Sequence, residues 1–525
     1  MQSEPSTGDA DARRDAAVLG LIAAVDLALH LALAGRYGYW IDELYFIACG
    51  AHLDWGYVDH PPLIAVVAAL SRALFGDSLR GIRVGPALAG AGLVFLTGWI
   101  ARALGGRRTA QITAALAAAI APVYAAFAGV LTMNAFEPLF WMGCAYLVIR
   151  IAQGASPKLW VAVGALAGVG VLNKHSMLFF AAALVAGLLV SPQRRLLFDR
   201  WVVLGGLAAL LLVLPHLYWQ AAHGWPTIEL LANARRYQHQ PVTPLQFIWG
   251  QIQIVQPITL PLWLAGLVFL FADRRAARVR FLGWAFAGAF LVFMLMQAKT
   301  YYLAPIYPLA FAAGAIVVED LARSRRWVAW TAVVLLLIGG VITAPYAMPI
   351  LPVADLPTYL RLLGIQEVRP ETRQMGNVPQ IFADMLGWEE LVTEVARVYA
   401  GLSPAERERA VIWGSYYGPA AAVDYFGPRY GLPRAISGHQ NYFLWGPGDA
   451  DGGLIIAVAF NAADLAPWCD RLELVAQVAC EYCMPDRRTQ PIHVCRGLKM
   501  PLREFWPQVK CWTCDRAPFQ RHAAG

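Results

Sequence analysis

The feature that most constrains the fold of this chain is a series of about eleven long apolar segments, each near the roughly 20 residues that a helix needs to cross a bilayer. The composition agrees, because 58% of the 525 residues are hydrophobic and 15% are charged, whereas soluble proteins carry roughly 25% charged residues. The expected spans lie near residues 17–35, 82–103, 109–130, 135–151, 158–173, 175–191, 201–219, 252–271, 280–297, 303–319 and 327–345. We therefore predict a mainly α-helical, polytopic membrane protein.

The net charge of +7 does not indicate nucleic-acid binding, because the Lys and Arg residues lie between the apolar segments rather than on one soluble face. Every second loop is basic, and basic loops remain in the cytoplasm. The sequence therefore predicts a cytoplasmic tail over residues 1–16 and a first external loop over residues 36–81. It places the region beyond residue 348 outside the cytoplasm. We expect a transmembrane domain over residues 17–348.

The composition changes near residue 350, where three prolines precede a region in which charged residues become frequent. Short apolar runs at Ala410–Trp413 and Leu454–Phe460 alternate with helical patterns at Gly418–Phe426 and Ala462–Val478. This alternation predicts a soluble α/β domain over residues 349–525, which is long enough to bury a core of its own.

Six of the eight cysteines lie in this domain: Cys469, Cys480, Cys483, Cys495, Cys511 and Cys514. Two Cys-x-x-Cys pairs among them would indicate zinc in a cytosolic protein. Because the domain is expected outside the cytoplasm, where disulfides persist, we favour disulfides, with structural zinc and free thiols as the alternatives.

The first external loop carries acids that a connector does not need. Asp42 and Glu43 are adjacent among tyrosines and tryptophans, and Asp59 and His60 precede two prolines that stiffen the backbone. A carboxylate that is partly desolvated by aromatic rings has a raised pKa, which suits a general base. The alternative is an aromatic belt at the membrane interface with a few solvated charges.

Cations are expected on the same side of the membrane. Lys174 lies between two apolar spans, Arg235 and Arg236 lie in the loop 220–251, and Lys299 precedes Tyr301 and Tyr302. An ammonium group and phenolic hydroxyls together suit a phosphate, although a polar turn or an interfacial belt would look similar. With the carboxylates, these residues favour transfer of a group from a lipid-linked phosphate. A flippase or transporter of lipid-linked saccharides and a non-catalytic scaffold are the alternatives.

These residues resemble a known family. Asp42-Glu43, the run Asp59-His60-Pro61-Pro62-Leu63 and the junction Lys299-Thr-Tyr-Tyr-Leu-Ala-Pro are similar to motifs of bacterial members of the protein O-mannosyltransferase and aminoarabinose transferase family. The resemblance covers nearly the whole chain. It implies the GT-C glycosyltransferase fold, with amphipathic helices in the first external loop, in the bacterial cytoplasmic (inner) membrane. The implied partners are a polyprenyl-phosphate sugar donor, membrane lipid and a hydroxyl-bearing acceptor, with inversion at the sugar and no nucleic acid.

The resemblance also implies roles for individual residues. Asp42 would be the base that activates the acceptor, and Glu43 would help to position it. Asp59 and His60 would meet the donor phosphate or a metal, and Lys299 with Tyr301 or Tyr302 would bind the phosphate. The chain departs from aminoarabinose transferases at His60, where they have a lysine, and at Asn233, which aligns with a histidine metal ligand. The sequence therefore implies no certain cofactor and leaves a divalent metal ion open.

Overall fold

The structure is a computed structural model that describes residues 7–238, 240–364 and 376–513. The chain divides into two compact units. The first consists of Met1–Gly35, Phe75–Leu217 and Pro241–Ile350, and the second consists of Arg36–Leu74, Tyr218–Gln240 and Leu351–Gly525. The segment that carries Asp42 and His60 therefore belongs to the same unit as the C-terminal region.

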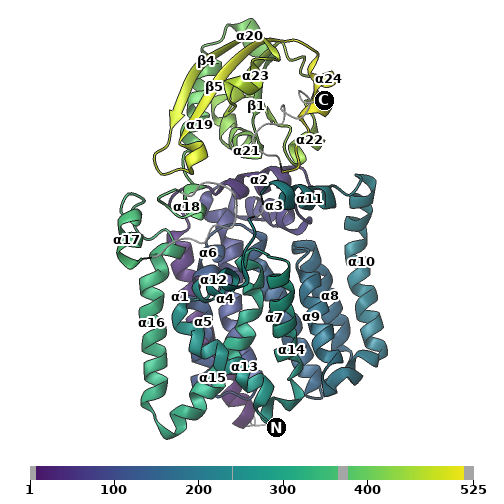
Figure 1. Cartoon of the computed structure of the whole chain (residues 1–525), viewed down its shortest axis with the longest axis vertical. Coiled ribbons are helices and arrows are strands. Elements are labelled where there is room, and N and C mark those ends of the chain that lie inside the picture. The colour runs from purple at the N-terminus through teal and green to yellow at the C-terminus, as the bar shows by residue number, and fades with distance from the viewer. Residues whose placement is uncertain (1–6, 239, 365–375, 514–525) are drawn as a thin grey trace, which may run out of the picture. The chain divides into compact units, whose positions relative to one another are not determined.

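The first unit is a bundle of helices, and its longer helices run roughly alongside one another in Figure 1. Its α-helices are α1 (Thr7–Leu33), α4 (Leu79–Ala103), α5 (Arg108–Ile120), α6 (Pro122–Ala128), α7 (Met133–Ala152), α8 (Leu159–Asn173), α9 (Met177–Leu189), α10 (Arg200–Ala222), α12 (Pro244–Ile254), α13 (Leu260–Ala272), α14 (Phe281–Leu295), α15 (Tyr307–Ser324) and α16 (Trp327–Ala347). The last part of α10 extends into the second unit.

Each apolar segment expected to span the membrane contains a helix, but the helices differ in length and in whether they are bent. Among the described residues, six helices are long and apolar enough to cross a membrane, or up to nine if each bent helix pair is one span. The bent pairs include α5 with α6, at 65°, and α12 with the segment that contains α13, at 98°. The remaining two segments form α8 and α14, which have 15 residues each and reach only about 22 Å. The prediction of a polytopic helical membrane protein is confirmed.

Small residues bring several of these helices into backbone contact, as is common between membrane helices. A Cβ atom at Gly205 of α10 would lie 2.3 Å from the Trp160 carbonyl oxygen of α8, and one at Gly164 would lie 1.9 Å from the Gly205 carbonyl oxygen. A Cβ atom at Gly314 of α15 would lie 1.9 Å from the Leu262 carbonyl oxygen of α13. Any side chain at these positions would push the paired helices apart.

The second unit combines short helices with one sheet. Its α-helices are α2 (Ile41–Ala51), α3 (Leu63–Phe75), α11 (Pro226–Tyr237), α17 (Leu356–Leu363), α18 (Gln380–Ala383), α19 (Trp388–Ala400), α20 (Pro404–Arg409), α21 (Tyr417–Phe426), α22 (Asn441–Trp445), α23 (Ala462–Leu465) and α24 (Leu502–Phe505). Its strands are β1 (Ala410–Gly414), β2 (Ala435–Ile436), β3 (Leu454–Val458), β4 (Cys469–Ala479) and β5 (Thr489–Leu498).

The five strands form one mixed sheet in the order β2-β1-β3-β5-β4. Strand β1 pairs in parallel with β2 and β3, whereas β5 pairs antiparallel with β3 and β4. Trp413 of β1 lies in a buried apolar core with Phe505 and Trp506, and α21 packs against β1. The parallel pairs place Gly414 and Ile436 at the same edge of the sheet, where the loops that lead to Tyr417 and Asn441 begin. The prediction of a C-terminal α/β region is confirmed.

One local expectation was wrong. The stretch Ala462–Val478 was expected to be helical, but it forms only the four-residue helix α23 before strand β4. Strand β4 pairs along its length with β5, and the disulfide between Cys469 and Cys495 joins the two strands. These long-range interactions outweigh the local helical pattern.

Candidate active site

The adjacent acids Asp42 and Glu43 lie in the first turn of α2, where the backbone N–H groups of the helix start need acceptors. The Glu43 carboxylate is fully buried and accepts a hydrogen bond from the Trp40 N–H at 2.8 Å. The Asp384 carbonyl accepts another from the Ile41 N–H at 3.1 Å. Glu43 therefore helps to fix the start of the helix, while Asp42 is half-buried. The two neighbours have different surroundings, as their spacing on a helix predicts.

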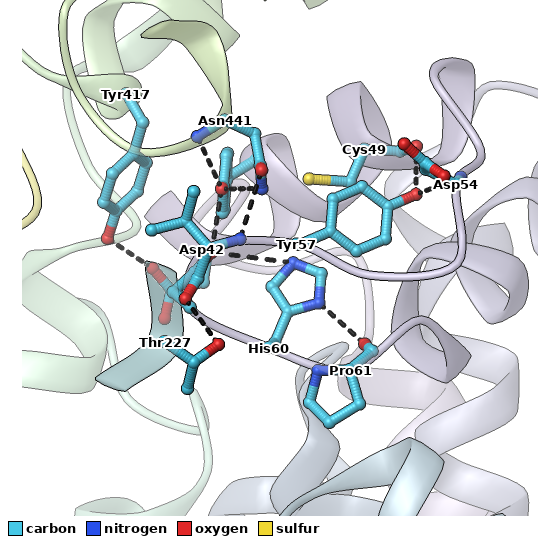
Figure 2. A network of polar contacts seen from close by, with 12 residues as sticks. Asp42, Cys49, Asp54, Tyr57, His60, Pro61, Thr227, Tyr417 and Asn441 are labelled. Carbon is cyan, nitrogen blue, oxygen red and sulfur yellow. Dashed lines mark hydrogen bonds and ion pairs between the residues drawn. The ribbon is translucent and has the colours of Figure 1, made fainter. Parts of the chain in front are cut away.

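The Asp42 carboxylate is held by a tyrosine that is remote in sequence. The Tyr417 hydroxyl donates a hydrogen bond to Asp42 Oδ1 at 2.6 Å, as Figure 2 shows. Burial raises the pKa of Tyr417 well above its ordinary value of 10.0, and the negative charge of Asp42 raises it further. The phenol therefore stays neutral and donates to the carboxylate. Tyr417 is the first residue of α21 and follows strand β1 after Ser415 and Tyr416.

Asp59 is held by a chain of hydrogen bonds that also ends in the C-terminal region. The Tyr45 hydroxyl donates to Asp59 Oδ1 at 2.9 Å and accepts from Asn441 Nδ2 at 2.6 Å. Asn441 Oδ1 accepts from the Val58 N–H at 3.2 Å, and the Val58 carbonyl accepts from Thr227 Oγ1 at 2.9 Å. Figure 2 labels Asn441 and Thr227 of this network. Segments near residues 227 and 441 thus fix the backbone that carries Asp59.

The His60 imidazole is fully buried beneath this loop. Its Nδ1 lies 2.9 Å from the Pro61 carbonyl oxygen, which only accepts, so the proton is on Nδ1. Its Nε2 makes no hydrogen bond to the described residues and lies 4.0 Å from Asp59 Oδ1. The ring stacks on Tyr57 with centroids 4.6 Å apart. Of the two side chains, only that of Asp59 reaches solvent, and it is 24% exposed.

In the first unit, Lys174 lies in a polar cluster. Its Nζ donates to Glu137 Oε2 at 2.8 Å and to Asn134 Oδ1 at 2.6 Å. It also lies 4.7 Å from the ring centroid of Tyr302 and 5.6 Å from that of Tyr301. The structure thus brings together three predicted residues, Lys174, Tyr301 and Tyr302. The positive charge of the lysine is balanced by a carboxylate that is 3% exposed.

The other predicted cations differ in exposure. Lys299 is half-buried and precedes the 3-10 helix η4 (Thr300–Ile306), where its carbonyl accepts a hydrogen bond from the Tyr302 N–H. Arg235 and Arg236 lie in the last turn of α11 and are exposed. Asn233, which aligns with a metal ligand in the resembled family, donates to the Trp512 carbonyl oxygen at 2.9 Å.

The described part of the chain contains no group of three or more His, Cys, Asp or Glu side chains that would hold a metal ion. The cysteines of the C-terminal region form disulfides between Cys469 and Cys495 and between Cys480 and Cys483. Cys511 is also disulfide-bonded, and Cys514 lies outside the described residues.

Sequence reasoning assigned no role to several residues of these clusters. Tyr417 and Asn441 lie in loops after β-strands, and their approach to Asp42 and Tyr45 depends on tertiary structure. Glu137 gave a usable signal, because a carboxylate in an apolar segment needs a partner at the same depth. Lys174 follows the next apolar segment and supplies that partner.

Comparison with known proteins gives one family match. Residues 59–219 match the family model described as dolichyl-phosphate-mannose-protein mannosyltransferase. The chain is 27% identical over 349 residues to an undecaprenyl phosphate-α-4-amino-4-deoxy-L-arabinose arabinosyl transferase of Pseudomonas fluorescens. The aligned region covers 60% of this chain and 63% of the relative. It is 24% identical to the lipid A galacturonosyltransferase RgtD of Rhizobium johnstonii, over 53% of this chain and 59% of the relative. The chain thus spans about six tenths of the length of these relatives.

The fold resembles two solved structures of ArnT from Cupriavidus metallidurans. The apo structure has a TM-score of 0.59 at 16% sequence identity, with 90% of this chain and 97% of that chain covered. The structure bound to undecaprenyl phosphate has a TM-score of 0.57 with the same coverage. At this identity the likeness concerns the fold. The chain therefore shares the fold of ArnT, and part of its sequence is similar to the mannosyltransferase family model and to the two named transferases.

Proposed function

We propose that this protein transfers a sugar from a polyprenyl-phosphate donor to a hydroxyl group of an acceptor outside the cytoplasm, with inversion at the sugar. The observation that carries the proposal is the half-buried Asp42 carboxylate, which a neutral phenol holds at 2.6 Å. A carboxylate that accepts a hydrogen bond from a neutral phenol is held in one orientation, in which it can act as a general base. The names of the relatives support undecaprenyl phosphate as the lipid carrier.

The reaction would run in one displacement. The acceptor hydroxyl attacks the anomeric carbon of the sugar and transfers its proton to the Asp42 carboxylate. A carbon–oxygen bond to the acceptor forms while the bond between the anomeric carbon and the phosphate oxygen breaks. The electron pair leaves with the phosphate, so the products are the glycosylated acceptor and the polyprenyl phosphate. The negative charge that develops on the leaving group needs cations nearby.

We propose that Lys299, Arg235 and Arg236, which are half-buried or exposed, stabilise that negative charge. Asp59 would be a further donor-contacting residue, with the buried His60 beside it. Lys174 would act differently, because Glu137 already balances its charge. We propose that the ammonium of Lys174 orders the rings of Tyr301 and Tyr302, whose hydroxyls would then bind the donor. A divalent metal is not needed for this scheme.

We also propose that the protein lies in the bacterial inner membrane with its N-terminus in the cytoplasm. The transmembrane domain would span residues 17–348, and residues 349–525 would form the extracytoplasmic domain. Single cysteines at the exposed positions Leu474 and Arg275 test this orientation. A membrane-impermeant maleimide added to spheroplasts should label Leu474→Cys and not Arg275→Cys. The reverse labelling pattern would invert the topology.

The donor class can be tested by mass spectrometry of lipids that copurify with the detergent-extracted protein. Wild type should carry a polyprenyl phosphate or its sugar adduct, and the mass of the adduct would name the sugar. Lys299→Ala should lose this lipid, while the control Lys158→Ala, in a basic loop, should retain it. Equal retention in both variants would remove Lys299 from the donor site. If wild type reconstituted with undecaprenyl phosphate bound none of it, the proposed donor class would be wrong.

The role of Asp42 can be tested with the adduct identified in that experiment. Asp42→Asn should lower transfer by a factor on the order of 10² to 10⁴, as expected for loss of a general base. Glu43→Gln should lose much less, because the amide oxygen can still accept the Trp40 N–H. Normal membrane insertion of both variants, measured by yield and gel filtration, is the control. An active Asp42→Asn enzyme would overturn the proposed mechanism.

A further inference from the structure

The predicted catalytic residue Asp42 and the predicted donor-contacting residue Asp59 are held by side chains from the C-terminal region, and all of these residues belong to one compact unit. Tyr417 donates to Asp42, and Asn441 donates to Tyr45, which in turn donates to Asp59. Figure 2 shows Tyr417 and Asn441 approaching the segment of Asp42 and His60 from a separate part of the chain. The C-terminal region therefore supplies hydrogen-bond donors to the segment that carries Asp42 and Tyr45.

The Tyr417 ring is held tightly, so that its hydroxyl has a defined direction. The ring lies 4.7 Å from that of Tyr45 and stacks on His439 with centroids 5.2 Å apart and planes at 28°. Tyr416 packs against it edge-on at 5.9 Å. Since these are ring contacts, replacing Tyr417 by Phe would keep them and remove only the hydroxyl group.

The charged and titratable groups described near this contact include Asp384, Asp59, Glu43 and His439. Asp384 and Asp59 both raise the pKa of Tyr417 through their negative charge. Asp384 is paired with Arg487 at 3.0 Å. Glu43, next to Asp42 on α2, accepts the Trp40 N–H, and burial lowers the pKa of His439 to about 4, so its ring is neutral near pH 7.

We propose that Tyr417 is a positioning residue that orients the Asp42 carboxylate toward the acceptor, so that the C-terminal α/β region is part of the catalytic machinery. This inference rests on the proposed function. A hydrogen bond from a phenol to a carboxylate is charge-assisted and favours the ionised acid. Its removal should leave a smaller fraction of Asp42 ionised at a given pH, and it should release the orientation of the side chain.

The first test measures the protonation of Asp42 without any substrate. Dicyclohexylcarbodiimide reacts with protonated carboxyl groups, and peptide mass spectrometry quantifies labelling of Asp42 against pH in the purified full-length protein. In Tyr417→Phe, the pH at which Asp42 labelling is half-maximal should rise by about one unit or more, given the strength of hydrogen bonds to charged groups. The control Tyr430→Phe removes an exposed hydroxyl that bonds Thr393 and should leave the curve in place. Identical curves for wild type and Tyr417→Phe would overturn the inference.

The second test separates this inference from the proposed function. With the donor adduct found for wild type, Tyr417→Phe should lower kcat roughly ten- to a hundredfold near neutral pH, leave the KM for the donor unchanged and recover part of its rate at higher pH. Asp42→Asn should keep its much lower rate at every pH. If Asp42→Asn is inactive while Tyr417→Phe keeps the wild-type pH profile, only the inference fails. If Asp42→Asn is active, the proposed function itself fails.

Discussion

Lys174 and Glu137 form an ion pair of 2.8 Å in which the carboxylate side chain is 3% exposed and the lysine side chain 15% exposed. The pair connects α7 with the turn between α8 and α9. Ser176 from the same turn donates to the other carboxylate oxygen, and Asn134 accepts from the lysine. The ammonium group and both carboxylate oxygens of the pair therefore have partners, as burial in an apolar bundle requires.

Breaking this pair from one side should be costly, because the remaining charge stays buried. We expect Lys174→Met to destabilise the bundle by about 3–5 kcal/mol. Adding Glu137→Gln should recover part of that loss, so that the double variant is less impaired than the sum of the single variants. Thermal unfolding in detergent measures both effects. Arg397→Met, which breaks an exposed pair with Glu394, is the control and should change the Tm little. Additive losses would mean that the two charges do not interact.

The helical part of the fold could be predicted from the sequence, because apolar length alone marks a membrane helix. The positions of the helices followed from this signal, but their breaks did not. The bend between α5 and α6 falls at Ala121-Pro122, where the missing N–H of the proline ends the ladder of helical hydrogen bonds. Strand β4 could not be predicted, since its pairing with β5 outweighs the local pattern.

The candidate site was predictable in part. Asp42, Glu43, Asp59 and His60 stand out because acids are unusual beside an apolar span. The contact that holds Asp42 could not be read from the sequence, because it depends on a distant residue. Asp42 is held by Tyr417, a separation of 375 residues, and no local pattern specifies such a contact.

The pH dependence of stability should reveal the buried imidazole of His439. Burial lowers its pKa from an ordinary value of 6.5 to about 4. Between these values the unfolded chain binds more protons than the folded one, so stability rises with pH. The contribution is present above about pH 6.5 and is lost as the pH falls through about 4, by up to roughly 3 kcal/mol.

The Tm of wild type should therefore fall more steeply between pH 6.5 and 4 than that of His439→Gln. His493, whose pKa is also lowered by burial, and Asp424, whose pKa is raised by burial, titrate in both proteins. The comparison of the two slopes removes their contribution. Parallel curves would mean that His439 is protonated in the folded protein at the same pH as in the unfolded chain.

The disulfide between Cys469 and Cys495 should stabilise the C-terminal region by cross-linking β4 and β5 across 26 residues. Loop-closure entropy for this length gives roughly 3–4 kcal/mol. Replacing both cysteines by Ala should lower the Tm accordingly. The pair Cys480→Ala and Cys483→Ala should cost less, because its loop spans 3 residues. Reductant should lower the Tm of wild type, whereas a chelator should not. A chelator effect would indicate bound zinc.

Two adjacent glycines of α10 provide the sharpest test of helix packing in the bundle. A Cβ atom at Gly205 would lie 2.3 Å from the Trp160 carbonyl oxygen of α8, but one at Gly206 would meet nothing within 4 Å. Gly205→Ala should therefore separate α8 from α10 and lower both the Tm and the yield of folded protein. Gly206→Ala makes the same chemical change one position along and should be neutral or slightly stabilising, since Ala favours helix over Gly. Because helix propensity changes equally in both variants, any difference between them measures the backbone contact alone. Equal Tm values would show that α8 and α10 do not pack at this distance.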